Sequence, residues 1–178
     1  MGFGGPHAGY MSCREEHVRR MPGRLISVSK DAQGNNAYRL TWQTREQHIK
    51  RERATSNICT AQVLLAVIAG MYAAYHGPKG LVRIANRIHL LTALLIVGVE
   101  KLGHTTHGNT PIFDTLRIKL GNRNADEVIK SAEKLKLNLR RYEDGTLGVT
   151  LDEISSTETI QSILTAFNGG ANPKFDIN

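Results

Sequence analysis

The strongest constraint on the fold of this chain is a long apolar region that a helix-breaking motif divides in two. From Ile58 to Tyr75 the residues are apolar nearly all round, which predicts a helix buried on most of its faces. His76-Gly77-Pro78 should end this helix, because glycine favours the left-handed C-cap and proline prevents continuation. From Pro78 to Gly103, apolar residues recur at spacings of three and four, which predicts a second helix. About 25 residues make a rod of roughly 37 Å, so we expect this helix to link two structural units.

The region before these helices predicts a hairpin and a short charged helix. Two apolar runs, Leu25–Val28 and Tyr38–Trp42, flank a polar turn, as in a hairpin. Thr44-Arg45-Glu46-Gln47 has the pattern of a capping box and should open a helix through Arg53. Thr55-Ser56-Asn57 then supplies N-cap residues for the apolar helix.

The region after His104 predicts a small α+β layer in the order β-α-β-β-α. A half-exposed strand lies near Leu116–Leu120, and an amphipathic helix follows at Ala125–Leu135. A hairpin over Leu139–Leu151 turns at Asp144-Gly145, a pair that favours a type I′ turn. A capping box at Ser155–Glu158 opens the last helix, whose inward residues should be Ile160, Ile163, Leu164 and Phe167. We expect an open sheet with both helices on one face, and a division into residues 1–103, a small domain at 104–168 and a frayed tail at 169–178.

The charge distribution indicates an anionic partner. The 178 residues include 23 Lys and Arg against 16 Asp and Glu, and the stretch from Arg14 to Arg53 holds 10 basic and 5 acidic residues. Such a patch suits a phosphate cofactor, a nucleic acid or an acidic protein. Nucleic acid is not favoured, because the run from Arg45 to Arg53 lacks interleaved aromatic residues and reads equally as a solvated helix face.

Other features exclude several classes of protein. The two cysteines, Cys13 and Cys59, form no Cys-x-x-Cys pair, as expected for free thiols in a reducing compartment. No secretory or mitochondrial targeting pattern opens the chain. The longest apolar stretch, near Val63–Ala74, is shorter than the roughly 20 residues of a membrane span, so we expect no membrane insertion.

Few residues are candidates for chemistry. Cys59 lies near the start of the apolar helix, where the helix dipole lowers a thiol pKa, but the position favours a buried, inert cysteine. His104 and His107 lack the further ligands that zinc needs, so we expect no metal site. Thr55, Ser56 and Asn57 offer hydroxyl, amide and backbone N–H groups beside Arg51 and Arg53. From the residues alone, a phosphate site and a plain helix cap are equally good interpretations.

Several specific motifs give this sequence a family resemblance. They are Gly4-Gly5-Pro6-His7-Ala8, Met21-Pro22-Gly23-Arg24, Gln43-Thr44-Arg45-Glu46-Gln47-His48-Ile49, Ala54-Thr55-Ser56-Asn57-Ile58-Cys59-Thr60-Ala61-Gln62, Met71-Tyr72-Ala73-Ala74-Tyr75-His76-Gly77, Phe113-Asp114-Thr115-Leu116 and the run from Asp144 to Glu153. Over roughly residues 1–168 the sequence resembles glycine decarboxylase, the P-protein of the glycine cleavage system, also called glycine dehydrogenase (aminomethyl-transferring). Within that family it looks like the end of the first of two homologous halves.

The resemblance implies an α/β fold and a place in a larger enzyme. Members of the family are fold-type I (aminotransferase-like) enzymes that use pyridoxal 5′-phosphate to decarboxylate glycine, passing the aminomethyl group to the lipoyl arm of the H-protein. By this resemblance the chain holds the edge of the large domain, a long linking helix and the small domain. Its partners would be the remaining halves or subunits and the lipoylated H-protein, in the mitochondrial matrix if the source is eukaryotic or the cytoplasm if it is bacterial.

The resemblance also assigns roles to particular residues. The Schiff-base lysine of such enzymes follows a histidine in the second half, and none of the nine lysines here does so, so we expect no catalytic residue in this chain. The glycines and proline from Gly2 to His7 predict a tight loop whose backbone can approach another group closely. By the resemblance, the loop Gly4-Gly5-Pro6-His7 would lie just after a degenerate copy of that site. Arg45, Glu46, Gln47 and His48 would lie at the interface with the other half.

A similarity to cysteine desulfurases, also of fold type I, bears on the phosphate. Their Gln-Glu…Arg-x-Gly-Thr pattern resembles the sequence from Gln43 to Thr55, and their threonine reaches the cofactor phosphate of the neighbouring subunit. By that analogy Thr55, supported by Ser56 and Asn57, would approach the phosphate held by the partner half. The alternative function is a non-catalytic basic module that binds a polyanion through Arg45–Arg53.

Overall fold

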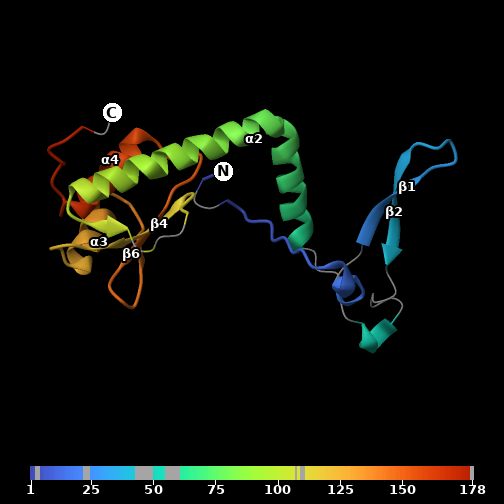
Figure 1. Cartoon of the computed structure of the whole chain (residues 1–178). Coiled ribbons are helices and arrows are strands. Elements are labelled where there is room, and N and C mark those ends of the chain that lie inside the picture. Colours follow the sequence, from blue (N-terminus) through green and yellow to red (C-terminus); the bar gives the residue numbers. More distant parts are fainter. Residues whose placement is uncertain are drawn as a thin grey trace. The chain divides into compact units, whose positions relative to one another are not determined.

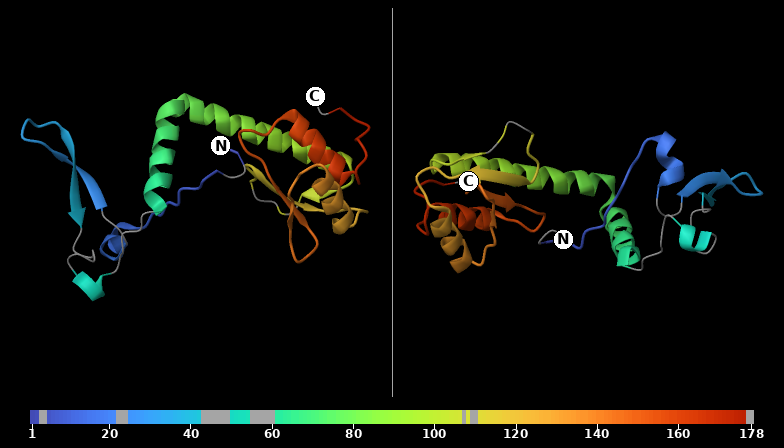
Figure 2. Two further views of the ribbon diagram at one scale, coloured as in Figure 1. Left: turned by 180° about the vertical axis from the view of Figure 1, so that it is seen from behind. Right: turned by 90° about the horizontal axis from the view of Figure 1, so that it is seen from below.

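The chain is described by a computed structural model that covers residues 1–2, 5–21, 25–42, 50–54, 61–106, 108 and 111–176. It divides into two compact units (Figures 1 and 2): unit 1 is residues 1–6 with 72–178, and unit 2 is residues 7–71. This division cuts the long helix between Met71 and Tyr72, whereas we expected a boundary after Gly103.

Unit 2 contains the predicted hairpin. Strand β1 (Leu25–Lys30) pairs antiparallel with β2 (Asn36–Trp42), and Asp31 holds the turn by accepting backbone N–H bonds from Gln33 and Asn35 at 2.9 and 2.8 Å. A 3₁₀ helix, η1 (Glu15–Arg20), precedes the hairpin. Of the predicted charged helix, only its end is described, where η2 (Arg51–Arg53) forms a single 3₁₀ turn.

The two apolar helices form one element with a break at the predicted position. Helix α2 extends over Ala61–Lys101, and inside it Gly77 has φ 63° and ψ 176°. Positive φ at this position suits glycine, and Pro78 then starts a new run of helical turns because its fixed φ fits a first helical position. The break at His76-Gly77-Pro78 is therefore confirmed.

Unit 1 is a four-stranded antiparallel sheet backed by helices. Strands β3 (Thr105–Thr106), β4 (Thr115–Lys119), β5 (Arg140–Arg141) and β6 (Leu147–Thr150) lie in the order β3-β4-β6-β5. Helices α3 (Ala125–Lys134) and α4 (Thr157–Phe167) pack with the end of α2 on one face of the sheet. The predicted β-α-β-β-α order is confirmed, with β3 as an additional short edge strand.

One core joins these elements. Its largest buried side chains come from α2, the sheet, α3 and α4: Leu95, Val99, Leu116, Ile118, Val128, Leu147, Ile160, Leu164 and Phe167. The four residues predicted to face inward on the last helix are all buried. Gly98 brings α2 close to α4, because a Cβ there would lie 2.7 Å from Leu164 Cδ1.

Two local details differ from the sequence prediction. The hairpin turn is not type I′: the Gly145 N–H bonds to the Tyr142 carbonyl at 3.0 Å, and Gly145 has positive φ while Asp144 does not. Asp144 instead accepts bonds from the Thr146 N–H and hydroxyl, which hold a longer turn with an αL glycine. The last helix is capped one residue later than predicted, since Ser156 and Thr159 form the reciprocal box.

The C-terminal residues are packed rather than frayed as we expected. Asn168 donates to the Ala171 carbonyl at 2.9 Å, and Thr165 bonds to Asn172 at 3.2 Å. Phe175 packs against the core, where Lys101 lies 5.1 Å from its ring centroid.

By length and hydropathy alone, residues 63–101 of α2 include a segment apolar enough to cross a membrane. The prediction of no membrane insertion considered only the apolar residues near Val63–Ala74, which are fewer than this segment contains. The second part of α2 contributes Leu91, Leu95 and Val99 to the core of unit 1, as a core helix of a folded domain does.

Candidate functional site

Most residues predicted to form the phosphate site and the interface lie outside the described residues. These are Gly4, Arg45, Glu46, Gln47, His48, Thr55, Ser56, Asn57 and Cys59. The same is true of His107. The predictions made for these residues therefore remain predictions.

The predicted tight loop near the start of the chain is partly described. The Gly5 N–H donates to the Gly2 carbonyl at 3.0 Å, and Gly5 has φ 86°. Gly2 packs directly against Ile154, because a Cβ on Gly2 would lie 2.2 Å from Ile154 Cδ1. Pro6 and His7 are exposed. The opening glycines thus allow a close approach, as the sequence predicts, and the contacted residue belongs to the loop after β6.

That loop is fastened to α2 by polar contacts. Arg87 donates to the carbonyl of Glu153 and, at 2.8 Å, to the carbonyl of Ser155. The Tyr72 hydroxyl donates to the Glu153 carboxylate. Within the loop, Asp152 accepts backbone N–H bonds from Ile154 and Ser155 at 3.1 and 3.0 Å. We call these contacts the α2 latch; they join two of the family-like motifs, Met71–Gly77 and Asp144–Glu153.

Aromatic rings gather where α2 breaks. The ring centroids of Tyr72 and His76 lie 4.3 Å apart, and those of Tyr75 and His76 lie 5.0 Å apart. Gly80 leaves room for this cluster, because a Cβ there would lie 3.0 Å from His76 Cβ. The cluster therefore orders the break with side-chain packing as well as backbone geometry.

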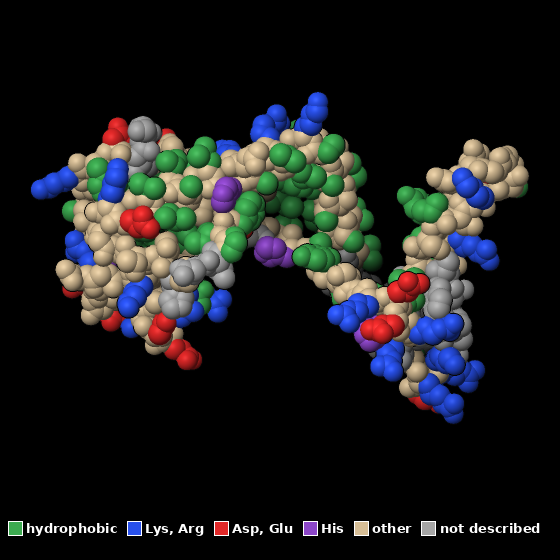
Figure 3. All heavy atoms as spheres, in the orientation of Figure 1, with side chains coloured by type: hydrophobic (Ala, Val, Ile, Leu, Met, Phe, Trp, Pro, Cys, Tyr) green, Lys and Arg blue, Asp and Glu red, His purple; other side chains and the backbone are tan. Residues whose placement is uncertain are grey.

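The part of α2 before Gly77, which we call the first arm, exposes five of its large apolar side chains (Figure 3). Their exposed fractions range from 56% to 86%, for Val63, Leu64, Val67, Met71 and Tyr75. The prediction that this helix is buried on most faces is therefore wrong for this chain. The hairpin of unit 2 has a similar surface, where the cross-strand neighbours Ile26 and Leu40, and Val28 and Tyr38, are all exposed. Apolar surface of this extent is characteristic of an interface.

His104 is a buried residue that follows the end of α2. Its Nε2 lies 3.1 Å from the Phe167 carbonyl, and its Nδ1 accepts the Gly121 N–H at 3.2 Å. This pairing requires the neutral imidazole with its proton on Nε2. Burial lowers the pKa of His104, which favours the same neutral form. With both nitrogens engaged, His104 is not available to a metal, and the described residues contain no cluster that could hold one.

The lysine and cysteine side chains that the structure describes are exposed. All nine lysines lie within the described residues and all are exposed to solvent. Cys13 is an exposed free thiol. A lysine that forms an internal aldimine needs a desolvated or cation-flanked position. None of the lysines lies in a buried position among the described residues, and the expectation of no Schiff-base lysine in this chain remains a prediction.

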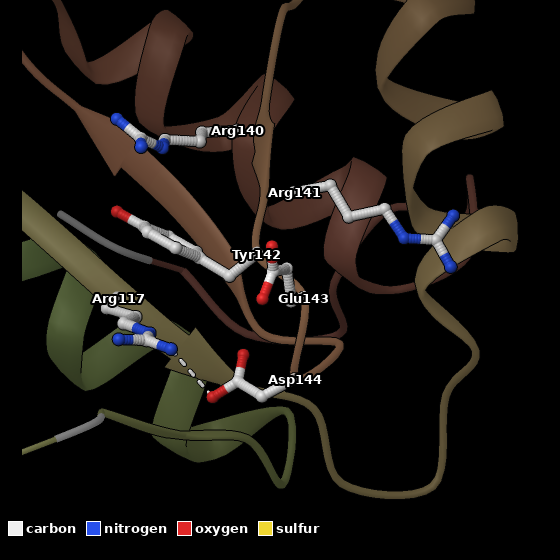
Figure 4. A pocket seen from close by; sticks show the side chains of 6 residues that line it. All are labelled: Arg117, Arg140, Arg141, Tyr142, Glu143 and Asp144. Atoms are coloured by element: carbon white, nitrogen blue, oxygen red, sulfur yellow. Dashed lines mark hydrogen bonds and ion pairs between the residues drawn. The ribbon is translucent and has the colours of Figure 1, made fainter.

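A shallow cavity of about 460 Å³ opens on unit 1 beside the β5–β6 hairpin (Figure 4). Its lining residues are Arg117, Arg140, Arg141, Tyr142, Glu143 and Asp144. Arg117 donates to the Asp144 carboxylate at 2.6 Å and to the Thr146 hydroxyl at 2.8 Å. Bonds from Thr146, and then the charge of Arg117, lower the pKa of Asp144, so this carboxyl group is ionised at neutral pH. No sequence pattern indicates this cavity, because its residues come from β4, from β5 and from the turn after β5.

Together these features define a chain of mixed helices and strands. Its helix α2 exposes apolar side chains in its first arm and packs with its end on an antiparallel sheet. The fold is also that of a solved NifS-like protein, with a TM-score of 0.52 and 16% identity over 67% of this chain and 36% of that one. The profile of the family "Glycine cleavage system P-protein" matches residues 1–167. The chain belongs to this family.

Individual relatives agree with that assignment. The chain is 52% identical over its whole length to a glycine dehydrogenase (decarboxylating) of Nostoc sp. and 55% identical over 99% of its length to one of Cupriavidus metallidurans. It covers only 18% of each of those proteins. A crystal structure of glycine decarboxylase (P-protein) in inhibitor-bound form matches with a TM-score of 0.70 and 30% identity, over 96% of this chain and 40% of that one. The chain thus spans less than a fifth of the length of these curated relatives.

Proposed function

We propose that this chain is the end of the first half of a glycine decarboxylase, where it supplies interface and pocket wall rather than chemistry. The complete enzyme would decarboxylate glycine and transfer the aminomethyl group to the lipoyl arm of the H-protein. The observation that carries this proposal is the family match over residues 1–167 in a chain that covers 18% of its curated relatives.

The uncovered apolar surfaces support a role at an interface. The first arm of α2 and the apolar side of the β1–β2 hairpin would be covered in the complete enzyme by parts that this chain does not contain. Burying such side chains stabilises an assembly by about 25 cal/mol per Å² of apolar surface. The remaining halves or subunits of the enzyme are therefore the first partners we propose.

The exposed lysines support a non-catalytic role. Pyridoxal phosphate would act in the complete enzyme as the electron sink for decarboxylation. No described residue of this chain would bind it covalently, and Thr55, Ser56 and Asn57 would contact its phosphate from across the interface. Gly5, Pro6 and His7 would continue the loop of the degenerate site. We propose a location in the bacterial cytoplasm, or in the mitochondrial matrix of a eukaryote.

The test of this function is a chimera. The matching segment of a complete, active bacterial glycine dehydrogenase is replaced by residues 1–168, and glycine-dependent exchange of bicarbonate carbon is measured. We expect the chimera to be active, and the isolated chain to release no CO₂ and to develop no Schiff-base absorbance with pyridoxal phosphate. Activity of the isolated chain, or a folded but inactive chimera, would refute the proposal.

The phosphate role of Thr55 is tested in the same chimera. Thr55→Val should weaken cofactor affinity about tenfold, because a hydrogen bond to a charged group is lost. Thr55→Ser keeps the hydroxyl and should retain most of the affinity. Equal affinities for Thr55→Val and the parent chimera would remove Thr55 from the site.

A further inference from the structure

The sheet of unit 1 has one face without helices, and this face carries an organised basic cluster. Leu116, Ile118, Leu147 and Val149 are buried toward the helices. Successive residues of a strand point to opposite faces, so Arg117 and Gly148 lie on the other side. The strand register aligns Arg117 with Gly148 and Gly148 with Arg140, which places the two arginines at the ends of one row across the sheet. We call Arg117, Arg140, Tyr142 and Gly148 the Arg140 face.

Gly148 makes this arrangement possible. The ring of Tyr142 lies over it: a Cβ on Gly148 would be 3.0 Å from Tyr142 Cε2, 3.2 Å from its hydroxyl and 3.3 Å from Arg140 Cβ. The Arg117 and Arg140 guanidinium carbons lie 4.3 and 5.0 Å from the Tyr142 ring centroid (Figure 4). Cation–π contacts of this kind hold a guanidinium in place without consuming its hydrogen-bond donors.

The three arginines that line the cavity differ in how their charge is used. Arg117 is paired with Asp144, and Arg141 is paired with Asp126 on the opposite side of the hairpin. Arg140 is exposed, and its guanidinium forms no hydrogen bond or ion pair with any residue within the described ranges. Glu143 lines the same cavity, and no ion pair joins it to Arg140 among those residues. Arg140 therefore presents a positioned guanidinium with its donors unoccupied.

This charge pattern favours a carboxylate over a nucleic acid. A nucleic-acid backbone is bound by several unpaired cations that follow its phosphates. Here Arg117 and Arg141 already have carboxylate partners, so Arg140 is the one arginine of the cavity lining whose guanidinium has no partner among the described residues. A single carboxylate needs only one guanidinium, to which it can bind through two parallel N–H···O hydrogen bonds.

We propose that the Arg140 face docks an acidic segment of a separate protein, one carboxylate of which pairs with Arg140 over the ring of Tyr142. The remaining donors of the site would be the Tyr142 hydroxyl and the free edge of the Arg140 guanidinium. The contact is independent of glycine decarboxylation, so either proposal can fail without the other.

The experiment uses the 178-residue chain and a short fluorescein-labelled Glu-rich peptide, with the matching Gln-rich peptide as a blank. Binding is followed by fluorescence anisotropy for the wild type, Arg140→Gln and Arg141→Gln. The two variants change net charge equally at adjacent positions, but Arg141 lies on the opposite side and already has a partner. We expect Arg140→Gln to weaken binding about tenfold or more, and Arg141→Gln to change it by about twofold or less.

Further measurements separate the other occupants. Equal losses in the two variants would mean unspecific attraction to a basic chain and would overturn the proposal. Tighter binding of a single-stranded oligonucleotide, lost in Arg140→Gln, would assign the face to a nucleic acid. If the chimera described above does not bind the acidic peptide although it is folded, then the rest of the enzyme covers the face, and a separate protein is excluded. Arg140→Lys keeps the charge without the fork, and weaker binding by it would support the two-bond geometry.

Discussion

The two arms of α2 differ in whether the same chain covers part of their apolar surface. Before Gly77, Val63, Val67 and Met71 are more than half exposed, whereas after it Leu91, Leu95 and Val99 are 0–6% exposed. The second arm packs on a sheet and two helices of the same chain. Among the described residues, no side chain of the first arm belongs to this core, and the chain spans less than a fifth of the length of its curated relatives. An apolar helical pattern thus predicts that the helix packs against another surface. Whether that surface lies in the same chain cannot be inferred from the helix alone.

The largest effect expected from this contrast is on stability. Leu95→Ala removes a fully buried side chain and should lower the free energy of unfolding by about 2–5 kcal/mol. Val67→Ala, in the exposed first arm, should change it by about 0.5 kcal/mol or less. Urea unfolding followed by circular dichroism measures both, and similar losses would show that the first arm is packed within this chain.

A smaller effect should follow from opening the α2 latch. Arg87→Ala removes two bonds to the carbonyls of Glu153 and Ser155 and should cost about 1–2 kcal/mol. Arg83, one turn earlier on the same helix, is exposed, and its Ala variant is the matched control. If both variants unfold at the same urea concentration, the latch does not stabilise unit 1.

The third effect depends on pH and arises at the buried His104, which follows the end of α2 at Lys101. The pKa of His104 is lowered below 6.5 by burial, and the nearby Arg123 charge acts in the same direction, against the bond to Phe167. Below pH 6.5 the unfolded chain therefore binds more protons than the folded chain. Unfolding free energy should fall as pH decreases from 6.5 to the folded-state pKa, by at most about 1.4 kcal/mol per pH unit.

The control for this pH dependence is His104→Gln, which can keep a donor and an acceptor but cannot titrate. The difference between the two pH profiles isolates His104 from the other histidines. Parallel profiles between pH 7 and pH 5 would mean that His104 titrates alike in both states.

The smallest effect on the free energy of unfolding is expected in the first arm, where a substitution should instead change self-association of the chain. Val67→Glu should leave unfolding within about 0.5 kcal/mol of wild type while reducing self-association in sedimentation velocity, because it places a charge on uncovered apolar surface. Asn86→Glu makes the same charge change at an exposed polar position of α2 and is the control. Equal sedimentation of the two variants would show that the first arm does not drive association.

Local signals in the sequence were sufficient for most elements of the fold. Gly77-Pro78 fixed the break in α2 because positive φ and proline act within a few residues. The strands near Ile118 and Val149 followed from alternation. Strand β3 could not be predicted, because its two residues pair with β4 and carry no pattern of their own. The cap at Ser156 was misplaced by one residue because serine occurs at both 155 and 156, and Ser155 instead bonds to Asp152.

Features that depend on distant contacts were harder to predict. The burial of His104 depends on Phe167, 63 residues away, so its own neighbours give no indication of it. The Arg140 face could not be predicted without the register of β4, β6 and β5, which brings its residues together. The phosphate site at Thr55 rests on resemblance, since its residues lie outside the described ranges.

Hydrogen exchange of residues 61–76 tests the central claim, that the first arm of α2 is built to pack on the rest of a larger enzyme. It should be measured in the isolated chain and in the active chimera, with residues 91–99 as an internal reference. We predict rapid exchange in the isolated chain and strong protection in the chimera, while residues 91–99 are protected in both. Equal protection of residues 61–76 in the two proteins would contradict the account.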